Sequence, residues 1–446
     1  MTKDFLKIFS SNLIKMCSTI IATFFLPKFL SIEDYAVIKS YQLYVSYIGV
    51  FSFGYNDGIF LKYGGQKFLE IDKKDVGKEQ ITIFAYQVIL SALISFFAIC
   101  QRDFIVAMVG LSFLPTTMFS YYTYMYQSTG EFNRYSRVMN INSWLVFAVN
   151  VLLVFCFKEE CGNVYIFFYV ITNYIIFLLN FVTFNRTMKV GHCLPALPIF
   201  IENVRQGILL MLGNLAYIFF VGVDKLFVKA FLGVESFARY SFAAQLLNVI
   251  NMFITPLSLT LYNYFGKRKS NKFESYMREL LVVILFLMLI IVYFYRLIIQ
   301  LFIQKYSAAI EILVILFLAQ IFLTINTAIY VNLFKVYKRQ KTYFRNLLVV
   351  VMLSIIANFV FMMIKKSELS IVYATLFCMI IWTILNLCSF RHTSFSKKEV
   401  FYITFCIALY ISTSFRMEPL SGGVIYVLGF SVATLLFRHE LLKRNA

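Results

Sequence analysis

The stretch FLSIEDYA (Phe29–Ala36) returns 202 residues later as FLGVESFA (Phe231–Ala238). At the same distance upstream of the two copies stand the related triplets SNL (Ser11–Leu13) and GNL (Gly213–Leu215). Because polar residues recur together with apolar ones, the matches predict an internal duplication rather than chance similarity between apolar runs. A fainter echo at an offset of 208 pairs Tyr135, Arg137 and Asn150 with Tyr343, Arg345 and Asn358.

The regions around both copies are strongly apolar. Of the 446 residues, 61% are hydrophobic and only 14% are charged, and the mean hydropathy is +0.78. A soluble globular protein carries about 25% charged residues, because its surface faces water. The composition therefore predicts a protein whose surface faces bilayer hydrocarbon.

Membrane-spanning helices are predicted along the whole chain. Each needs about 20 consecutive, mostly apolar residues. The last two of the predicted runs are short, and whether both cross the membrane is left open; either way the number of spans is even, so both termini lie on one side. The 14 runs lie near 8–27, 36–56, 81–100, 104–126, 138–157, 164–184, 207–228, 237–262, 279–299, 307–332, 346–364, 369–389, 400–414 and 421–437.

The repeated stretches set the size of the duplicated unit. One copy joins the first and second spans, and the other joins the seventh and eighth, so the unit is six spans long. Two copies with an even number of spans face the same way, and parallel repeats are a transporter architecture with the substrate path at their interface. We predict an all-α polytopic membrane protein with two pseudo-symmetric six-helix lobes, 1–195 and 196–395, and a C-terminal helix pair, 396–446.

Basic residues are concentrated in alternate connectors. With a cytoplasmic N-terminus, the inside segments hold about three times as many Lys and Arg residues as the outside ones. This bias predicts that both termini are cytoplasmic, and it explains the net charge of +19 without a nucleic-acid partner.

The first apolar run has no small-residue cleavage site, so we expect it to be retained as a helix. The connectors are too short for a separate catalytic domain.

Charged residues inside the spans are the candidate binding residues. A charge near the bilayer centre costs on the order of 3 kcal/mol, so such residues commonly face a protein interior or a water-filled cavity. Lys15, Lys39, Lys225 and Arg239 are predicted to contact a diphosphate or acidic sugars in a cavity between the lobes, and Asp224 to tune that site or to bind a coupling cation. The alternative is that Lys39, Lys229 and Arg239, near span ends, extend to the membrane surface.

Residue patterns for metal, cofactor or covalent chemistry are missing from the sequence. The eight cysteines include no CxxC pair, the three histidines fall in connectors, and neither HExxH nor GxSxG occurs. We therefore expect no metal, no cofactor and no enzyme activity.

The segment Gly54–Gly65 is interpreted as a helix end with a tight turn rather than a phosphate-binding loop. The run Tyr121–Tyr126 is interpreted as an interfacial belt rather than a sugar-stacking surface.

Three segments resemble the bacterial polysaccharide-repeat flippases of the multidrug/oligosaccharidyl-lipid/polysaccharide exporter superfamily. FLSIEDYA (Phe29–Ala36) is similar to the family's loop lG-x-e-x-y/f-G. Asp224-Lys225, followed by FLGVESFARYSFAAQ (Phe231–Gln245), is similar to its pattern D-R…L-G-x-x-x-x-G-x-Y-x-x-A. GYNDGIFLKYGGQKF (Gly54–Phe68) looks like the O-antigen and capsule branch. With the length and the two lobes, the resemblance covers essentially the whole chain.

The resemblance implies a multi-pass protein of a bacterial inner membrane that takes part in O-antigen, lipopolysaccharide or capsule biosynthesis. Its cargo would be an oligosaccharide linked to undecaprenyl diphosphate, moved outward through the membrane lipid by alternating access. The resemblance further implies O-antigen assembly proteins as partners and coupling to an H⁺ or Na⁺ gradient. Ala36 and Ala238 replace the family's loop glycines, and Lys225 replaces an arginine, which gives up bidentate phosphate geometry.

Other functions remain in view. A drug/cation antiporter of the same superfamily is disfavoured, because the spans carry basic rather than acidic residues. A peptidoglycan-precursor lipid flippase is a closer rival, since its cargo shares the diphosphate. From a different class, a membrane O-antigen polymerase or ligase typically carries one large periplasmic loop, which this sequence lacks. A structural or assembly role is a further alternative.

Overall fold

The computed structural model describes residues 19–189, 191, 193–267 and 270–443. Within these ranges the chain is helical almost throughout and contains no strand. Contacts between residues divide the chain into two compact units, Met1–Leu215 and Ala216–Ala446. The division falls inside the long helix α9 (Leu197–Phe231), whereas the predicted lobes meet in the loop that precedes it.

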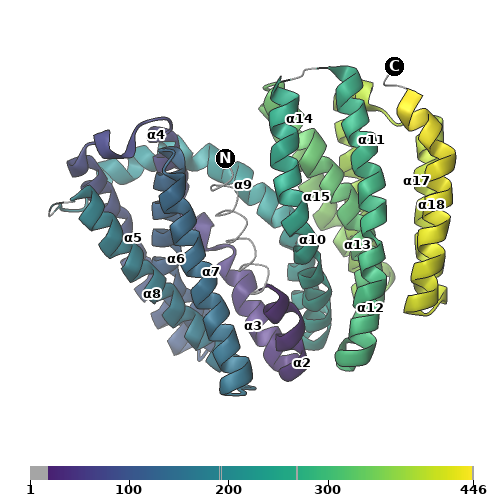
Figure 1. Ribbon diagram of the computed structural model, residues 1–446. Helices are drawn as coiled ribbons and strands as arrows, with labels where there is room; N and C mark the ends of the chain where they lie inside the picture. The colour runs from purple at the N-terminus through teal and green to yellow at the C-terminus, as the bar shows by residue number, and fades with distance from the viewer. Residues whose placement is uncertain (1–18, 190, 192, 268–269, 444–446) are drawn as a thin grey trace. The chain divides into compact units, whose positions relative to one another are not determined.

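The first unit is a bundle of helices around α6 (Phe104–Ser128). α6 contacts the helices on every side of it, α3, α4, α5, α7 and α8, and α5, α6 and α8 lie side by side in the blue part of Figure 1. The unit's other helices are η1 (Ile21–Phe25), α2 (Leu26–Phe29), α3 (Ile32–Val45), η2 (Ile48–Ser52), α4 (Tyr55–Lys62), η3 (Phe68–Glu70), α5 (Lys73–Cys100), α7 (Phe132–Val151), η4 (Leu152–Cys156), α8 (Gly162–Met188) and the first part of α9.

The second unit has the corresponding centre in α13 (Ala309–Ile325). Most residues of α13 are buried, and the helix packs against α10, α11, α12, α16 and α17. The unit's other helices are α10 (Val234–Lys267), α11 (Asn271–Met288), α12 (Ile290–Phe302), η5 (Gln304–Tyr306), η6 (Asn326–Tyr330), α14 (Val331–Val336), α15 (Gln340–Ile364), α16 (Glu368–Ser389), η7 (Arg391–Thr393), α17 (Lys397–Arg416) and α18 (Pro419–Lys443).

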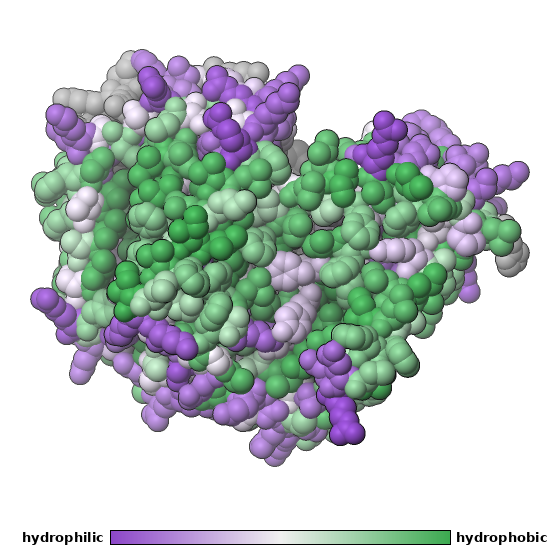
Figure 2. Space-filling view, turned by 180° about the vertical axis from the view of Figure 1, so that it is seen from behind, coloured by the Kyte–Doolittle hydropathy of each residue, from purple (hydrophilic) through white to green (hydrophobic). Residues whose placement is uncertain are grey.

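The all-α polytopic prediction is confirmed. Every predicted span from 36–56 onward falls on a helix or on a run of consecutive short helices; of the span 8–27, only the end lies within the described residues. Ten helices of the described chain are long and apolar enough to cross a membrane, and α18 is one of them whereas α17 is not. On the face drawn in Figure 2, hydrophobic residues cover the middle and hydrophilic residues gather toward the margins, as expected where hydrocarbon contacts the middle of the surface.

Glycines let α4 and α9 approach to backbone contact inside the first unit. A Cβ atom on Gly58 would lie 2.0 Å from the carbonyl oxygen of Asn203, and one on Gly207 would lie 2.0 Å from the carbonyl oxygen of Gly54. Gly54 also has a positive φ of 82° at the start of α4, a conformation that glycine adopts without strain. The predicted turn at Gly54 is therefore a close helix crossing as well.

The tyrosine run after Tyr121 is part of the core of the first unit. Tyr121, Tyr122 and Tyr126 are buried there, and the Tyr122 hydroxyl accepts a hydrogen bond of 3.1 Å from the Gln80 amide. The interfacial-belt interpretation of this run is therefore wrong for these three residues. The cause is that α6 is the central helix of its bundle, so its C-terminal part contacts neighbouring helices instead of lipid headgroups.

Candidate functional site

Lys39 is buried inside the first unit. It lies on α3, whose N-terminus is capped by the Ser31 hydroxyl, which accepts a hydrogen bond of 2.9 Å from the Asp34 N–H. The Lys39 side chain is only 7% exposed. Its ammonium group donates a hydrogen bond of 3.0 Å to the Gln42 side chain and lies 5.1 Å from the centre of the Tyr35 ring, close enough for a cation–π contact. These contacts hold the charge of Lys39 within the bundle.

Asp224 and its neighbour Lys225 lie on α9 in the second unit. The Asp224 carboxylate is buried and accepts a hydrogen bond from the Tyr240 hydroxyl of α10. Its other oxygen accepts one of 2.7 Å from the Lys225 backbone N–H. The Lys225 side chain is partly exposed. Asp224 therefore joins α9 to α10, and Lys225 follows it by about 100° around the helix.

Arg239 is paired with two carboxylates. Its guanidinium lies 2.9 Å from Glu368 at the start of α16 and 3.3 Å from Glu235 one turn earlier on α10. The Nε atom donates a second hydrogen bond, of 3.1 Å, to the same Glu368 oxygen. These contacts favour a role for Arg239 in joining α10 to α16 over a role as an available cation.

The candidate residues belong to different parts of the structure. Asp224, Lys225 and Arg239 lie on α9 and α10 of the second unit, and Lys39 lies on α3 of the first. Lys15 lies outside the described residues. The convergence of the four basic side chains on one cavity therefore stays a prediction.

Sequence reasoning missed a buried carboxylate in the first unit. Glu79 of α5 is 1% exposed and lies 2.6 Å from the Lys62 ammonium, while the Tyr63 hydroxyl donates to its second oxygen at 2.8 Å. Burial by itself would lower the pKa of Lys62, but the Glu79 carboxylate outweighs burial and raises it. Lys62 therefore stays charged, and the pair fastens the end of α4 to the start of α5.

Like the first unit, the second unit has buried charged side chains, and they lie near the start of α11. Arg278 is 0% exposed; it lies 2.5 Å from Glu399, stacks over Phe395 at 4.3 Å and donates to the Thr393 carbonyl. One turn earlier, Glu274 is bound by neighbouring side chains from two other segments, at 2.6 Å by His392 and 2.8 Å by Tyr337.

The hydrogen bond to Glu274 involves a protonated tyrosine. Burial raises the pKa of Tyr337 to about 12, and so do the hydrogen bond to Glu274 and the negative charge of Glu274. The Tyr337 hydroxyl therefore remains a donor at neutral pH.

In the part of the chain that the structure describes, no three His, Cys, Asp or Glu side chains gather closely enough to hold a metal ion.

The protein resembles known proteins in its fold and not in its sequence. No protein-family model and no curated protein matches the sequence. Among solved structures, lipid II flippase MurJ in an inward closed conformation aligns with a TM-score of 0.71 at 14% identity, over 99% of this chain and 100% of that one. An inward-facing multidrug resistance MATE family transporter of the MOP superfamily aligns with a TM-score of 0.54 at 14% identity, over 86% of this chain and 96% of that one. At such identities the likeness is one of architecture, and the chain has the helical membrane-protein fold that these two transporters share.

Proposed function

We propose that this protein is a flippase of the exporter superfamily to which those transporters belong. It moves an oligosaccharide repeat unit of O-antigen or capsule, linked to undecaprenyl diphosphate, from the cytoplasmic to the periplasmic leaflet of a bacterial inner membrane. Both termini lie in the cytoplasm, and transport proceeds by alternating access of two six-helix lobes, 1–195 and 196–395, followed by the helix pair 396–446.

The likeness in fold to the lipid II flippase along the whole chain carries this proposal. A lipid-linked diphosphate combines a long hydrocarbon with a compact anion, so its transporter needs cations that are shielded from bulk water. Lys39 meets this requirement, because it is buried beside an amide and an aromatic ring. Lys225, on α9 of the second unit, is the second cation of the proposal.

The proposed roles of the remaining candidates differ in strength. Lys15 contacts the diphosphate or acidic sugars together with Lys39 and Lys225. Arg239 is assigned to the same group from the sequence, but its ion pairs with Glu235 and Glu368 support a structural contribution to the site. Asp224, which accepts a hydrogen bond from the Tyr240 hydroxyl, couples transport to an H⁺ or Na⁺ gradient through the charge of its carboxylate.

A peptidoglycan-precursor lipid is the second candidate cargo, and the likeness to lipid II flippase favours it specifically. It carries the same diphosphate, so the residues above serve either cargo. The resemblance of Gly54–Phe68 to the O-antigen and capsule branch supports the oligosaccharide instead.

Reconstitution into liposomes tests the proposal and separates the two cargoes. The purified protein is reconstituted with a fluorescent undecaprenyl-diphosphate oligosaccharide or with fluorescent lipid II, and bleaching by a membrane-impermeant reductant reports the probe in the outer leaflet. We expect the oligosaccharide lipid to reach the bleached pool faster than lipid II does. Faster movement of lipid II would reassign the cargo, and movement of neither lipid would refute the function.

A further inference from the structure

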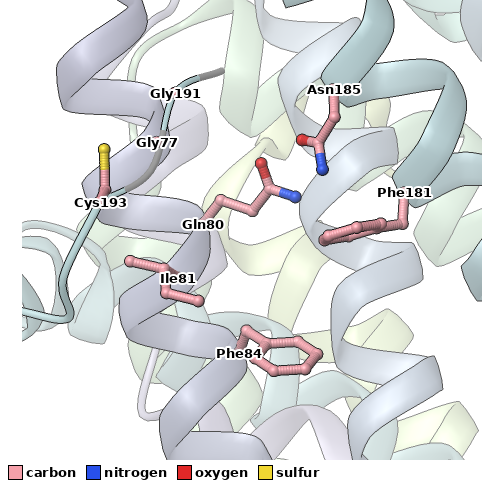
Figure 3. A pocket seen from close by; sticks show the side chains of 8 residues that line it. All are labelled: Gly77, Gln80, Ile81, Phe84, Phe181, Asn185, Gly191 and Cys193. Carbon is pink, nitrogen blue, oxygen red and sulfur yellow. The ribbon is translucent and has the colours of Figure 1, made fainter. Parts of the chain in front are cut away.

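A cavity of about 390 Å³ lies between α5 and α8 of the first unit (Figure 3). Its volume falls within the roughly 300–1,000 Å³ of small-molecule sites. Because α5 is the third predicted span and α8 the sixth, they run in opposite directions, and the cavity lies where α5 begins and α8 ends. The side chains that matter most for its chemistry are Gln80, Ile81, Phe84, Phe181, Asn185 and Cys193.

Two amide side chains with unused acceptors line the cavity. Gln80 is 4% exposed, and its nitrogen donates to the Tyr122 hydroxyl, but its Oε1 accepts no hydrogen bond from the described residues. The Oδ1 of Asn185 is buried and likewise accepts none from them. In Figure 3 the two amides face each other across the cavity. A buried carbonyl oxygen without a donor is unfavourable, so these two oxygens favour a ligand that carries hydroxyl groups.

The rest of the cavity wall is apolar. Ile81 and Phe84 follow Gln80 on the same face of α5, and Phe181 faces them from α8. The ring centres of Phe84 and Phe181 are 6.5 Å apart. Such a wall suits hydrocarbon, so the ligand combines a polar end with an apolar one.

Two lysines, Lys74 and Lys189, lie at the ends of α5 and α8 that border the cavity. Lys74 lies one turn before Gly77 on the face of α5 that lines it, and the Lys74 carbonyl accepts a hydrogen bond of 3.8 Å from the thiol of Cys193. Lys189 lies one turn after Asn185, at the end of α8. Both side chains are exposed. The acidic residue Asp75 lies about 200° around the helix from Gly77, so cations dominate the approach to the cavity.

We propose that this cavity binds an anionic glycerophospholipid of the surrounding bilayer, with phosphatidylglycerol as the fitting species. The glycerol hydroxyls donate to the free oxygens of Gln80 and Asn185, the phosphate lies near Lys74 and Lys189, and the start of an acyl chain packs on the Phe84 side. An ethanolamine headgroup fits less well, because its ammonium would lie beside the two lysines. The site contains none of the residues assigned to the cargo, so it stands whether or not the proposed transport function holds.

Cys193 provides a direct probe of occupancy, because it lines the cavity. Two single-cysteine variants of the full-length protein are compared in phosphatidylcholine nanodiscs with and without phosphatidylglycerol: one retains only Cys193, and the control retains only Cys388, which is exposed on α16. We expect phosphatidylglycerol to slow maleimide alkylation of Cys193 several-fold and to leave that of Cys388 unchanged. Equal rates at Cys193 with and without the lipid would overturn the proposal.

A second arm identifies the groups that bind. Asn185→Leu and the pair Lys74→Gln/Lys189→Gln are expected to abolish the protection of Cys193, while Lys341→Gln/Lys397→Gln, at exposed lysines of the second unit, is expected to retain it. Correct folding of each variant is checked by an unchanged midpoint of thermal unfolding. Protection by soluble glycerophosphoglycerol as strong as that by the lipid would show a site for a free phosphate ester and refute the lipid assignment.

Discussion

Arg239 and Glu368, 129 residues apart, form an ion pair of 2.9 Å that joins the start of α10 to the start of α16. The first unit has a counterpart, in which the Gly162 N–H at the start of α8 donates a hydrogen bond of 2.8 Å to the Asp34 carboxylate near the start of α3. In the predicted repeat, α3 and α10 are the second spans of their halves, and α8 and α16 are the sixth. Both units therefore fasten the second span to the sixth at the same end, although the residues differ, which supports the proposed duplication.

The ion pair is expected to stabilise the second unit measurably. In a double-mutant cycle of Arg239→Ala and Glu368→Ala, we expect a coupling free energy of about 1 kcal/mol, because the two side chains are only 22% and 19% exposed. Chemical unfolding of the detergent-solubilised protein measures it. Additive effects of the two single changes would show that the contact contributes nothing.

The α4–α9 crossing predicts opposite outcomes for two glycines of one helix. Gly207→Ala is expected to destabilise the protein by at least about 2 kcal/mol, because the new methyl group would overlap the backbone of α4. Gly213→Ala is the matched control, because no atom of the described residues, apart from its own helix backbone and chain neighbours, lies within 4 Å of the position that its Cβ would take. Alanine also favours helix by about 1 kcal/mol over glycine. Thermal unfolding compares the two; equal losses would contradict the close crossing.

Arg278 is expected to be critical for the stability of the second unit. Arg278→Met leaves the Glu399 carboxylate without its basic partner and should cost about 3 kcal/mol or more. The exposed pair of Lys67 and Glu70 supplies the control, since Lys67→Met should cost less than about 1 kcal/mol. The double variant Arg278→Met/Glu399→Gln, in which the side chain at 399 can still accept the capping hydrogen bond from the Ser396 N–H, is expected to recover part of the loss, and no recovery would argue against the buried pair as its cause.

Asp224 is the proposed coupling residue, and its loss should change what drives transport. Asp224→Asn keeps the contact with Tyr240 but removes the negative charge, so we expect slower transport that no longer responds to an imposed H⁺ or Na⁺ gradient. Tyr240→Phe, which keeps the charge, is expected to retain the response. Gradient-dependent transport by Asp224→Asn would exclude the assignment.

The apolar pattern predicted the helices well because each span must satisfy its own backbone in hydrocarbon. It misplaced the starts of α5 and α11, which begin at Lys73 and Asn271 although their apolar runs begin near 81 and 279. The additional turns are charged, so hydropathy assigned them to loops. They contain Glu79 and Arg278, whose burial depends on partners distant in sequence, and spacing along the chain does not reveal such partners.

The candidate site shows the same limit. Charge inside an apolar run identified Lys39 and Asp224, both of which are buried. It equally selected Arg239, whose partner Glu368 lies 129 residues away and is invisible to a local pattern. The interfacial-belt interpretation of the run that begins at Tyr121 fails for a related reason, because only the packing shows that α6 is a central helix.

Recognition of the diphosphate by cations within the spans is the central claim, and one measurement tests it directly. Reconstituted protein is assayed for outward movement of fluorescent undecaprenyl-diphosphate and undecaprenyl-monophosphate glycolipids that carry the same sugar, with Lys341→Gln as a control for loss of a surface charge. We predict that the protein moves the diphosphate lipid faster and that Lys39→Gln/Lys225→Gln loses this preference while remaining folded. An unchanged preference in the double variant would contradict the account.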